Sequence, residues 1–178
     1  LMHRIKNAGC KSKEDVVFTI KKIIDDILAE STSLTLIGGD VSSEFSIFEL
    51  FVKMLRKLAG SGRRTFVFVL GNHELWNFPG LSVDEIVDKY RTVLKENGMY
   101  LLHNDLFYRN ESDDMGIIPY DELIQSDNPA ILEKLRCTRL VILGGLGFSG
   151  YNEEFNANDG VYRATVDRNT EIQESKKF

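Results

Sequence analysis

Apolar and polar positions follow two different rhythms along the first hundred residues of the chain. Short apolar runs occupy residues 34–37 and 65–70, and each run ends abruptly at glycine and polar residues. Short β-branched and aromatic runs bounded by glycine are typical of buried strands. Between and around them, apolar residues recur at helical spacing over residues 14–30, 44–59 and 83–97. The pattern predicts an α/β fold in which the first two strands run parallel, joined by helix 44–59.

The ends of these three helices carry recognisable signals. Ser42 or Ser43 is expected to cap the start of helix 44–59, and Gly60 to end it. The first helix has an apolar face that we expect to pack on the sheet, made of Val16, Val17, Ile20, Ile23, Ile24 and Ile27. Capping boxes precede the first and third helices, namely Ser12 with Asp15 and Ser82 with Glu85.

The later part of the chain predicts shorter elements. Residues 100–102 and 106–108 suggest either a hairpin or two strands joined by a tight turn, with His103 as a structural residue. Residues 115–118 suggest another short strand, and a short helix is expected from Pro129 to Arg136. Residues 140–143 predict a buried central strand, and the polar segment 166–178 has the composition of a helix start.

The polar tips of the first two strands are the most informative positions. The first strand ends in Gly38, Gly39 and Asp40, and the second ends in the sequence Gly71-Asn72-His73-Glu74. The carboxyl ends of neighbouring parallel strands open on the same edge of a sheet, where ligands bind. We therefore expect Asp40 to meet the second tip in one crevice, with the glycines supplying tight turns.

This pair of motifs, GD followed by GNHE, resembles the calcineurin-like metallophosphoesterase family. The resemblance implies an αββα sandwich and a role for each matching position. Asp40 is similar to the carboxylate that bridges two metal ions, and Asn72 to an amide ligand of the second metal. His73 is similar to the histidine that assists phosphate-ester cleavage from outside the metal shell. In the phosphoprotein-phosphatase branch an aspartate orients this histidine, but Ser43 occupies that position here.

Two further motifs of the family are not found in the chain. It contains no Asp-x-His and no Gly-His-x-His, and its histidines are His3, His73 and His103. We therefore expect residues 1–178 to form a single metallophosphoesterase domain truncated at both ends, with His3 in a loop near the site. With Asp40 and Asn72 as its metal ligands, this chain by itself is expected to hold no metal pair and to be a poor enzyme.

The resemblance implies a hydrolase with two divalent metal ions, Mn, Fe or Zn, acting on phosphate esters with phosphodiesters favoured. A different class of function, a phosphoesterase fold used only as a binding scaffold, stays open because the two motifs are missing. A nucleotide-cofactor enzyme is a weaker alternative. Gly145, Gly147 and Gly150 spell GxGxxG, but no helical period follows them, so we interpret them as a tight turn.

Composition bears on the size of the core, the compartment and the expected partners. The hydrophobic fraction of 43% over 178 residues supports a substantial core, and the net charge of −5 does not indicate a nucleic-acid partner. Cys10 and Cys137 match no metal or redox spacing and are expected to be free thiols in the cytoplasm. Trp76 and Phe78 suggest either stacking on an aromatic ligand or, the favoured interpretation, cover for the core. The expected partners are a phosphate-ester substrate and, through exposed sheet edges, further copies of the chain, with no membrane.

Overall fold

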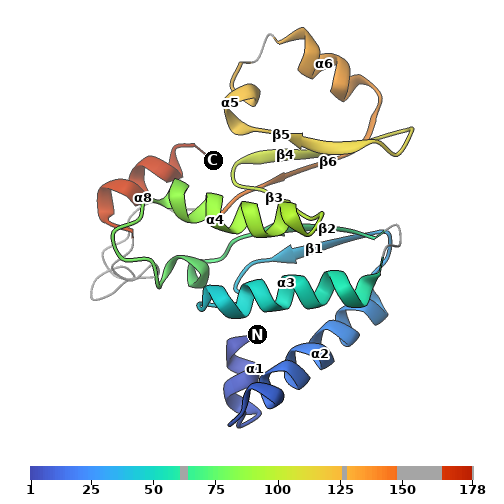
Figure 1. The fold of residues 1–178 in the computed structure, drawn as a ribbon. Coiled ribbons are helices and arrows are strands. Elements are labelled where there is room, and N and C mark those ends of the chain that lie inside the picture. Colours follow the sequence, from blue (N-terminus) through green and yellow to red (C-terminus); the bar gives the residue numbers. More distant parts are fainter. Residues whose placement is uncertain (61–63, 126–127, 148–165, 178) are drawn as a thin grey trace.

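Two three-stranded sheets lie at the centre of the protein (Figure 1). The computed structural model describes residues 1–60, 64–125, 128–147 and 166–177. The first sheet has the order β1-β2-β3 and contains Leu34–Gly38, Thr65–Val69 and Tyr100–Leu101. Both of its strand pairs are parallel, and Leu34 is in register with Thr65. The predicted parallel strand–helix–strand unit is therefore confirmed.

The second sheet is antiparallel and has the order β5-β4-β6. Its strands are Asp105–Asn110 (β4), Met115–Ile118 (β5) and Thr138–Gly144 (β6). The segments predicted on either side of His103 thus belong to different sheets, and a tight turn joins β3 to β4. Of the two arrangements suggested by the sequence, the hairpin is excluded.

Helices cover the outer face of the first sheet (Figure 1). They are α2 (Lys13–Glu30), α3 (Phe45–Ala59) and α4 (Val83–Glu96), of which α2 packs against α3. The predicted capping boxes at the starts of α2 and α4 are present, and Gly60 follows α3 with a φ of 68°. The helix that begins at Pro129 is also confirmed, as α6 (Pro129–Arg136), and the remaining short helices of this half include α5 (Tyr120–Leu123).

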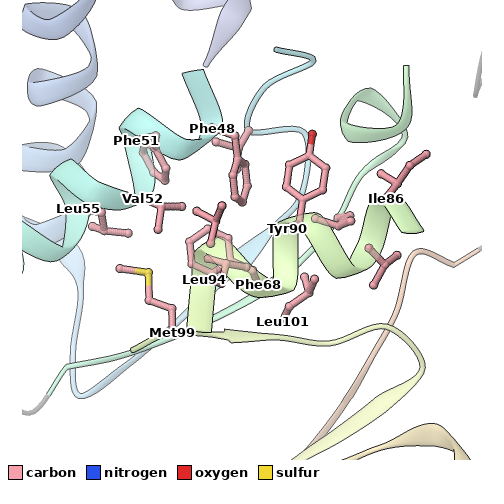
Figure 2. Close-up of a cluster of buried hydrophobic side chains, with 14 of the residues drawn as sticks. Phe48, Phe51, Val52, Leu55, Phe68, Ile86, Tyr90, Leu94, Met99 and Leu101 are labelled. Atoms are coloured by element: carbon pink, nitrogen blue, oxygen red, sulfur yellow. The ribbon is translucent and has the colours of Figure 1, made fainter. Parts of the chain in front are cut away.

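A large apolar cluster fixes α3 and α4 to the first sheet. Figure 2 shows Phe48 of α3 beside Tyr90 of α4, and Leu55, Leu94 and Phe68 belong to the same cluster. The rings of Phe48 and Tyr90 pack edge to face with centroids 4.6 Å apart. Because burial raises the pKa of the Tyr90 phenol, its hydroxyl stays protonated and donates a hydrogen bond to the carbonyl of Glu74 at 3.0 Å. The core thus reaches the polar tip of β2.

A second cluster lies between the two sheets. Val67 of β2, Leu102 of the β3–β4 turn and Phe107 of β4 are buried there. Tyr100 packs edge to face on Phe107 with centroids 5.2 Å apart. Side chains of a strand alternate between its two faces, so Val67 faces the second sheet while Phe66 and Phe68 face the helices. With α6 beyond the second sheet, the layers follow the expected αββα order (Figure 1).

Several details of the prediction were wrong. Residues Met2–Asn7 form helix α1, although their sequence shows no helical period, so His3 lies in a helix and not in a loop. The N-cap residue of α3 is Glu44 rather than either serine, and Ser42 instead accepts a hydrogen bond from the Glu44 N–H. Val17 is 41% exposed because it lies at the margin of the apolar face of α2.

Strand β6 also differs from its expected place. It forms one edge of the second sheet as described, and Val141 and Leu143 are 49% and 58% exposed on its outer face. It is therefore neither central nor fully buried. Gly144, at its end, faces the first sheet, where an added Cβ would come within 3.0 Å of Val69. Of the GxGxxG glycines, Gly150 lies outside the described residues, as does the segment that follows it up to residue 165, so the predicted tight turn is not described in full.

Helix α8 (Arg168–Ser175) places Glu174 against the turn between β3 and β4. His103 and Glu174 are both buried, with His103 Nε2 and Glu174 Oε2 separated by 3.8 Å. Burial lowers the pKa of His103, although the Glu174 carboxylate opposes this. The structural role expected of His103 agrees with this placement. Cys10 and Cys137 are free, as predicted. Within the described ranges, none of the helices has the length and apolar composition that a membrane crossing requires.

Candidate active site

The tip of β1 turns sharply so that Asp40 stands at the carboxyl edge of the first sheet. Gly39 has a φ of 85°, and Asp40 itself has a φ of 53°, in the left-handed region that residues with a Cβ seldom adopt. Strained backbone of this kind persists where neighbouring contacts impose it, and it is common at functional sites. The Asp40 side chain is exposed, so its carboxylate is available to a ligand.

A buried glutamate holds the two strand tips together. Glu74 is 0% exposed, and its carboxylate accepts backbone N–H groups from Gly71 at 2.8 Å, Asp40 at 3.0 Å and Ser42 at 3.0 Å. Burial raises the pKa of the Glu74 carboxyl, and these three N–H groups oppose the rise. One side chain from the β2 tip therefore fixes the backbone of the β1 tip.

This role of Glu74 was missed in the sequence. The signal was present, because Glu74 stands three residues after Gly71 at the start of the short 3-10 helix η1 (Asn72–Leu75), and its carboxylate accepts the Gly71 N–H as the third residue of a capping box does. The sequence does not reveal that the same carboxylate also reaches Asp40 and Ser42, more than thirty positions earlier.

Asn72 and His73 follow Gly71 in the first turn of η1, beside Asp40. The His73 backbone N–H donates a hydrogen bond to Asp40 Oδ1 at 3.3 Å, which brings the two predicted site segments into direct contact. The His73 ring lies 3.7 Å from the Trp76 ring, measured between centroids, with 31° between their planes. Phe78, in contrast, is 8% exposed and belongs to the core, as the favoured interpretation of that residue expected.

The approach of the two tips depends on glycine. A Cβ on Gly39 would lie 2.5 Å from the Gly71 nitrogen, and a Cβ on Gly71 would lie 2.6 Å from the Asp40 nitrogen and overlap the Asp40 carboxylate. Neither clash is relieved by rotating a side chain alone, since backbone atoms are involved. Gly38, one residue earlier, has open space where its Cβ would stand.

Gly71→Ala is therefore expected to lower the free energy of unfolding by about 1–3 kcal/mol, the usual cost of overpacking. It should also displace the Asp40 carboxylate. Gly38→Ala is the matched control, because its Cβ meets no atom within 4 Å. Urea unfolding of both variants measures the difference, and equal stabilities would contradict the close packing of the two tips.

Helix α1 begins near the carboxyl edge of the first sheet. Leu1, directly before α1, lies near Asp40 and Glu74. His3 does not join the site in the described contacts, since its Nε2 is paired with the Asn7 side chain at 2.9 Å and the residue is exposed. The expected loop position of His3 near the ligand is replaced by an outward position on α1.

Comparison with known proteins supplies the decisive observation. The model of the calcineurin-like phosphoesterase family matches residues 10–171, which is most of the chain. The chain belongs to this family. No curated protein and no solved structure matches it. Calcineurin-like phosphoesterases are in general hydrolases of phosphate esters that use divalent metal ions, and the αββα arrangement described above agrees with that fold.

Two side chains at the strand tips carry oxygen donors of the kind that bind divalent metal ions. A carboxylate on Asp40 and an amide on Asn72 are oxygen donors suited to hard or borderline dications. However, in the described ranges no three His, Cys, Asp or Glu side chains gather in a group that would hold a metal ion. The described donor set therefore does not complete a site for a metal pair.

A sizeable cavity lies elsewhere in the phosphoesterase. It has a volume of about 800 Å³ and is lined by α4, the β3–β4 turn and α5, and none of its lining residues is Asp40, Asn72 or His73. Arg91 lines it but is already paired with Asp88 at 2.6 Å and Asp105 at 3.3 Å. Its size alone does not make it the active site, because the family motifs follow β1 and β2 and none of these motif residues lines it.

Proposed function

We propose that this protein is a metal-dependent hydrolase of phosphate esters, with phosphodiesters as its preferred substrates and a pair of divalent ions as its cofactor. The observation that supports this most strongly is the contact between the two motifs. Asp40 and the Asn72–His73 segment lie side by side at the carboxyl ends of adjacent parallel strands, and the His73 N–H donates to the Asp40 carboxylate. The family match supports the reaction class.

Each of the three side chains has a role that its chemistry favours. Asp40 is anionic and has two carboxylate oxygens, so it suits the position shared by two cations. Asn72 offers a neutral oxygen, which ligates without adding charge. His73 carries ring nitrogens that donate a proton to the departing oxygen of the ester. The metal ions, Mn, Fe or Zn, would supply Lewis-acid activation of the phosphoryl group.

His73→Ala is expected to lower turnover by roughly 10²–10⁴-fold, the range that a general acid contributes. It should leave metal content nearly unchanged, because the ring acts on the leaving group. Hydrolysis of a chromogenic aryl phosphodiester by the complete gene product with added Mn²⁺ measures this, with metal analysis of the same samples. Since His3 is exposed and paired with Asn7, His3→Ala is the matched control and should retain full turnover.

Equal loss of metal in His73→Ala and in a variant of Asp40 would contradict the assigned role and move His73 among the ligands. A substrate panel decides the finer claim: faster hydrolysis of the aryl monoester than of the diester would overturn the diester preference.

A binding scaffold with the phosphoesterase fold is the second candidate function. It is favoured by one observation, that the described residues gather no complete metal-ligand group. The same assay separates the two candidates. Turnover by the complete gene product that requires Mn²⁺ supports the hydrolase, whereas absence of turnover with every divalent ion tested, on a folded protein, supports the scaffold.

A further inference from the structure

The ring of His73 has no carboxylate to orient it among the contacts of the described residues. The backbone of His73 donates a hydrogen bond to Asp40 and accepts one from the Trp76 N–H, and its ring lies against the ring of Trp76. Ser43 occupies the position where an orienting aspartate was sought, and the carbonyl of Ser43 accepts from the Asn77 amide at 2.8 Å. Another device must therefore set the plane of the ring.

The 3-10 turn supplies that device. Side chains three positions apart stand one above the other in a 3-10 helix. His73 lies in η1, Trp76 follows directly at its C-cap with helical dihedral angles, and the Trp76 N–H donates to the His73 carbonyl at 3.3 Å. The two rings are consequently brought into contact in a tilted arrangement, with centroids 3.7 Å apart and 31° between the planes.

Trp76 is itself held by its neighbours on both sides. Leu75 is 0% exposed and Phe78 is buried against Phe45 in the core, so the backbone on each side of the indole is anchored. Between them, the Asn77 amide binds the start of α3, donating to the Ser43 carbonyl and to the Glu44 carboxylate at 3.1 Å. An indole on such a segment presents a fixed surface.

We infer that Trp76 is the positioning residue of His73: its indole fixes the plane of the imidazole while leaving the ring edge, where both nitrogens stand, free of that contact. The catalytic meaning of this inference rests on the proposed function of His73. Orienting a group before reaction removes a large entropic cost, and small misplacements slow a reaction strongly. Trp76 is thus neither a ligand of the metal nor part of the buried core.

The contact itself is tested without any metal or substrate. The chain has one tryptophan and three histidines, so nuclear Overhauser effects from the indole to an imidazole are readily assigned. We expect such effects between Trp76 and His73 in the wild type, and a change in the His73 ring signals in Trp76→Leu. Unchanged ring signals in Trp76→Leu, in a variant that circular dichroism shows to be folded, would overturn the inference.

Kinetics test its consequence in the complete gene product. Trp76→Leu should lower kcat by about tenfold with little change in KM, and Trp76→Phe, which restores a flat ring, should recover most of the loss. In a His73→Ala background the Trp76→Leu substitution should have no further effect. An equal loss in both backgrounds would overturn the inference, because Trp76 would then act through another group.

Two outcomes distinguish the proposed role of His73 from the positioning role of Trp76. If His73→Ala leaves turnover unchanged, the proposed role of His73 fails and the stack has no catalytic meaning, even where the Overhauser contact persists. If His73→Ala is slow and Trp76→Leu matches the wild type in kcat, the proposed function stands and the positioning role is wrong.

Discussion

Asp40→Asn is expected to reduce phosphoester hydrolysis by about 10³-fold or more in the complete gene product, on the order of the several kcal/mol that a metal's Lewis-acid role is worth. The substitution removes one negative charge and one oxygen from the position assigned to the shared metal ligand. It keeps an oxygen that accepts the His73 N–H, so the contact between the strand tips is retained. The loss therefore reports on the charge of Asp40 rather than on the fold.

Asparagine is a better test here than alanine, because Asp40 has a φ of 53° and asparagine tolerates the left-handed region well. Alanine would add backbone strain to the loss of the carboxylate. Asp113 offers a matched control, since it also has a positive φ, 67°, but stands near Arg109 and Arg139 in the second sheet. Asp113→Asn should keep full activity, and a comparable loss in both variants would contradict the assignment.

Glu74→Ala should be the most destabilising substitution at the site, lowering the free energy of unfolding by at least about 3 kcal/mol, the lower limit for three buried donors left without a partner. Its carboxylate accepts three backbone N–H groups in a position of 0% exposure, and each donor left without a partner costs about 1–3 kcal/mol. The total free energy of unfolding of a domain is about 5–15 kcal/mol, so this variant should be only marginally folded. The stability of Glu74→Gln should lie between that of the wild type and that of Glu74→Ala, because its single amide oxygen still accepts some of the three N–H groups.

Glu85 provides the control for this prediction. It completes the capping box of α4 by accepting from Ser82 at 2.8 Å, the same local geometry, but it is exposed. Glu85→Ala should therefore cause a far smaller change in urea unfolding than Glu74→Ala. Similar changes for the two glutamates would show that the buried network at the strand tips does not stabilise the fold.

Local signals predicted much of this fold because the responsible interactions are close in sequence. The capping boxes at Ser12 and Ser82, the glycine that ends α3 and the proline that begins α6 all act within one helical turn. The short apolar runs ending at Gly38 and Leu70 likewise marked β1 and β2, and the helix between them required a parallel pair.

Errors arose where distant contacts decided the outcome. Helix α1 has no period of its own, and Ile5 is buried only because α1 packs on α2. Strand β6 has the composition of a buried strand, but its place at an edge of the second sheet leaves Leu143 exposed. Edge and centre are properties of the pairing order, which a single strand's residues do not specify.

In the candidate site, too, residues marked by local sequence signals were predicted, whereas contacts between distant residues were not. The motif positions Asp40, Asn72 and His73 were named from the sequence, and the parallel pairing that joins them followed from the helix between the strands. Glu74 was overlooked because its partners Asp40 and Ser42 are distant in the chain. The contact of His73 with Trp76 was also missed, since it depends on a 3-10 turn that the sequence analysis did not predict.

Binding of Mn²⁺ to the complete gene product, measured by isothermal titration for the wild type, Asp40→Asn and His73→Ala, tests the central claim most directly. The account predicts that Asp40→Asn loses most of the metal affinity, while His73→Ala keeps that of the wild type within about twofold and yet turns over the diester roughly 10²–10⁴-fold more slowly. Wild-type affinity in Asp40→Asn would contradict the account, because the carboxylate at the tip of β1 would then not be a metal ligand.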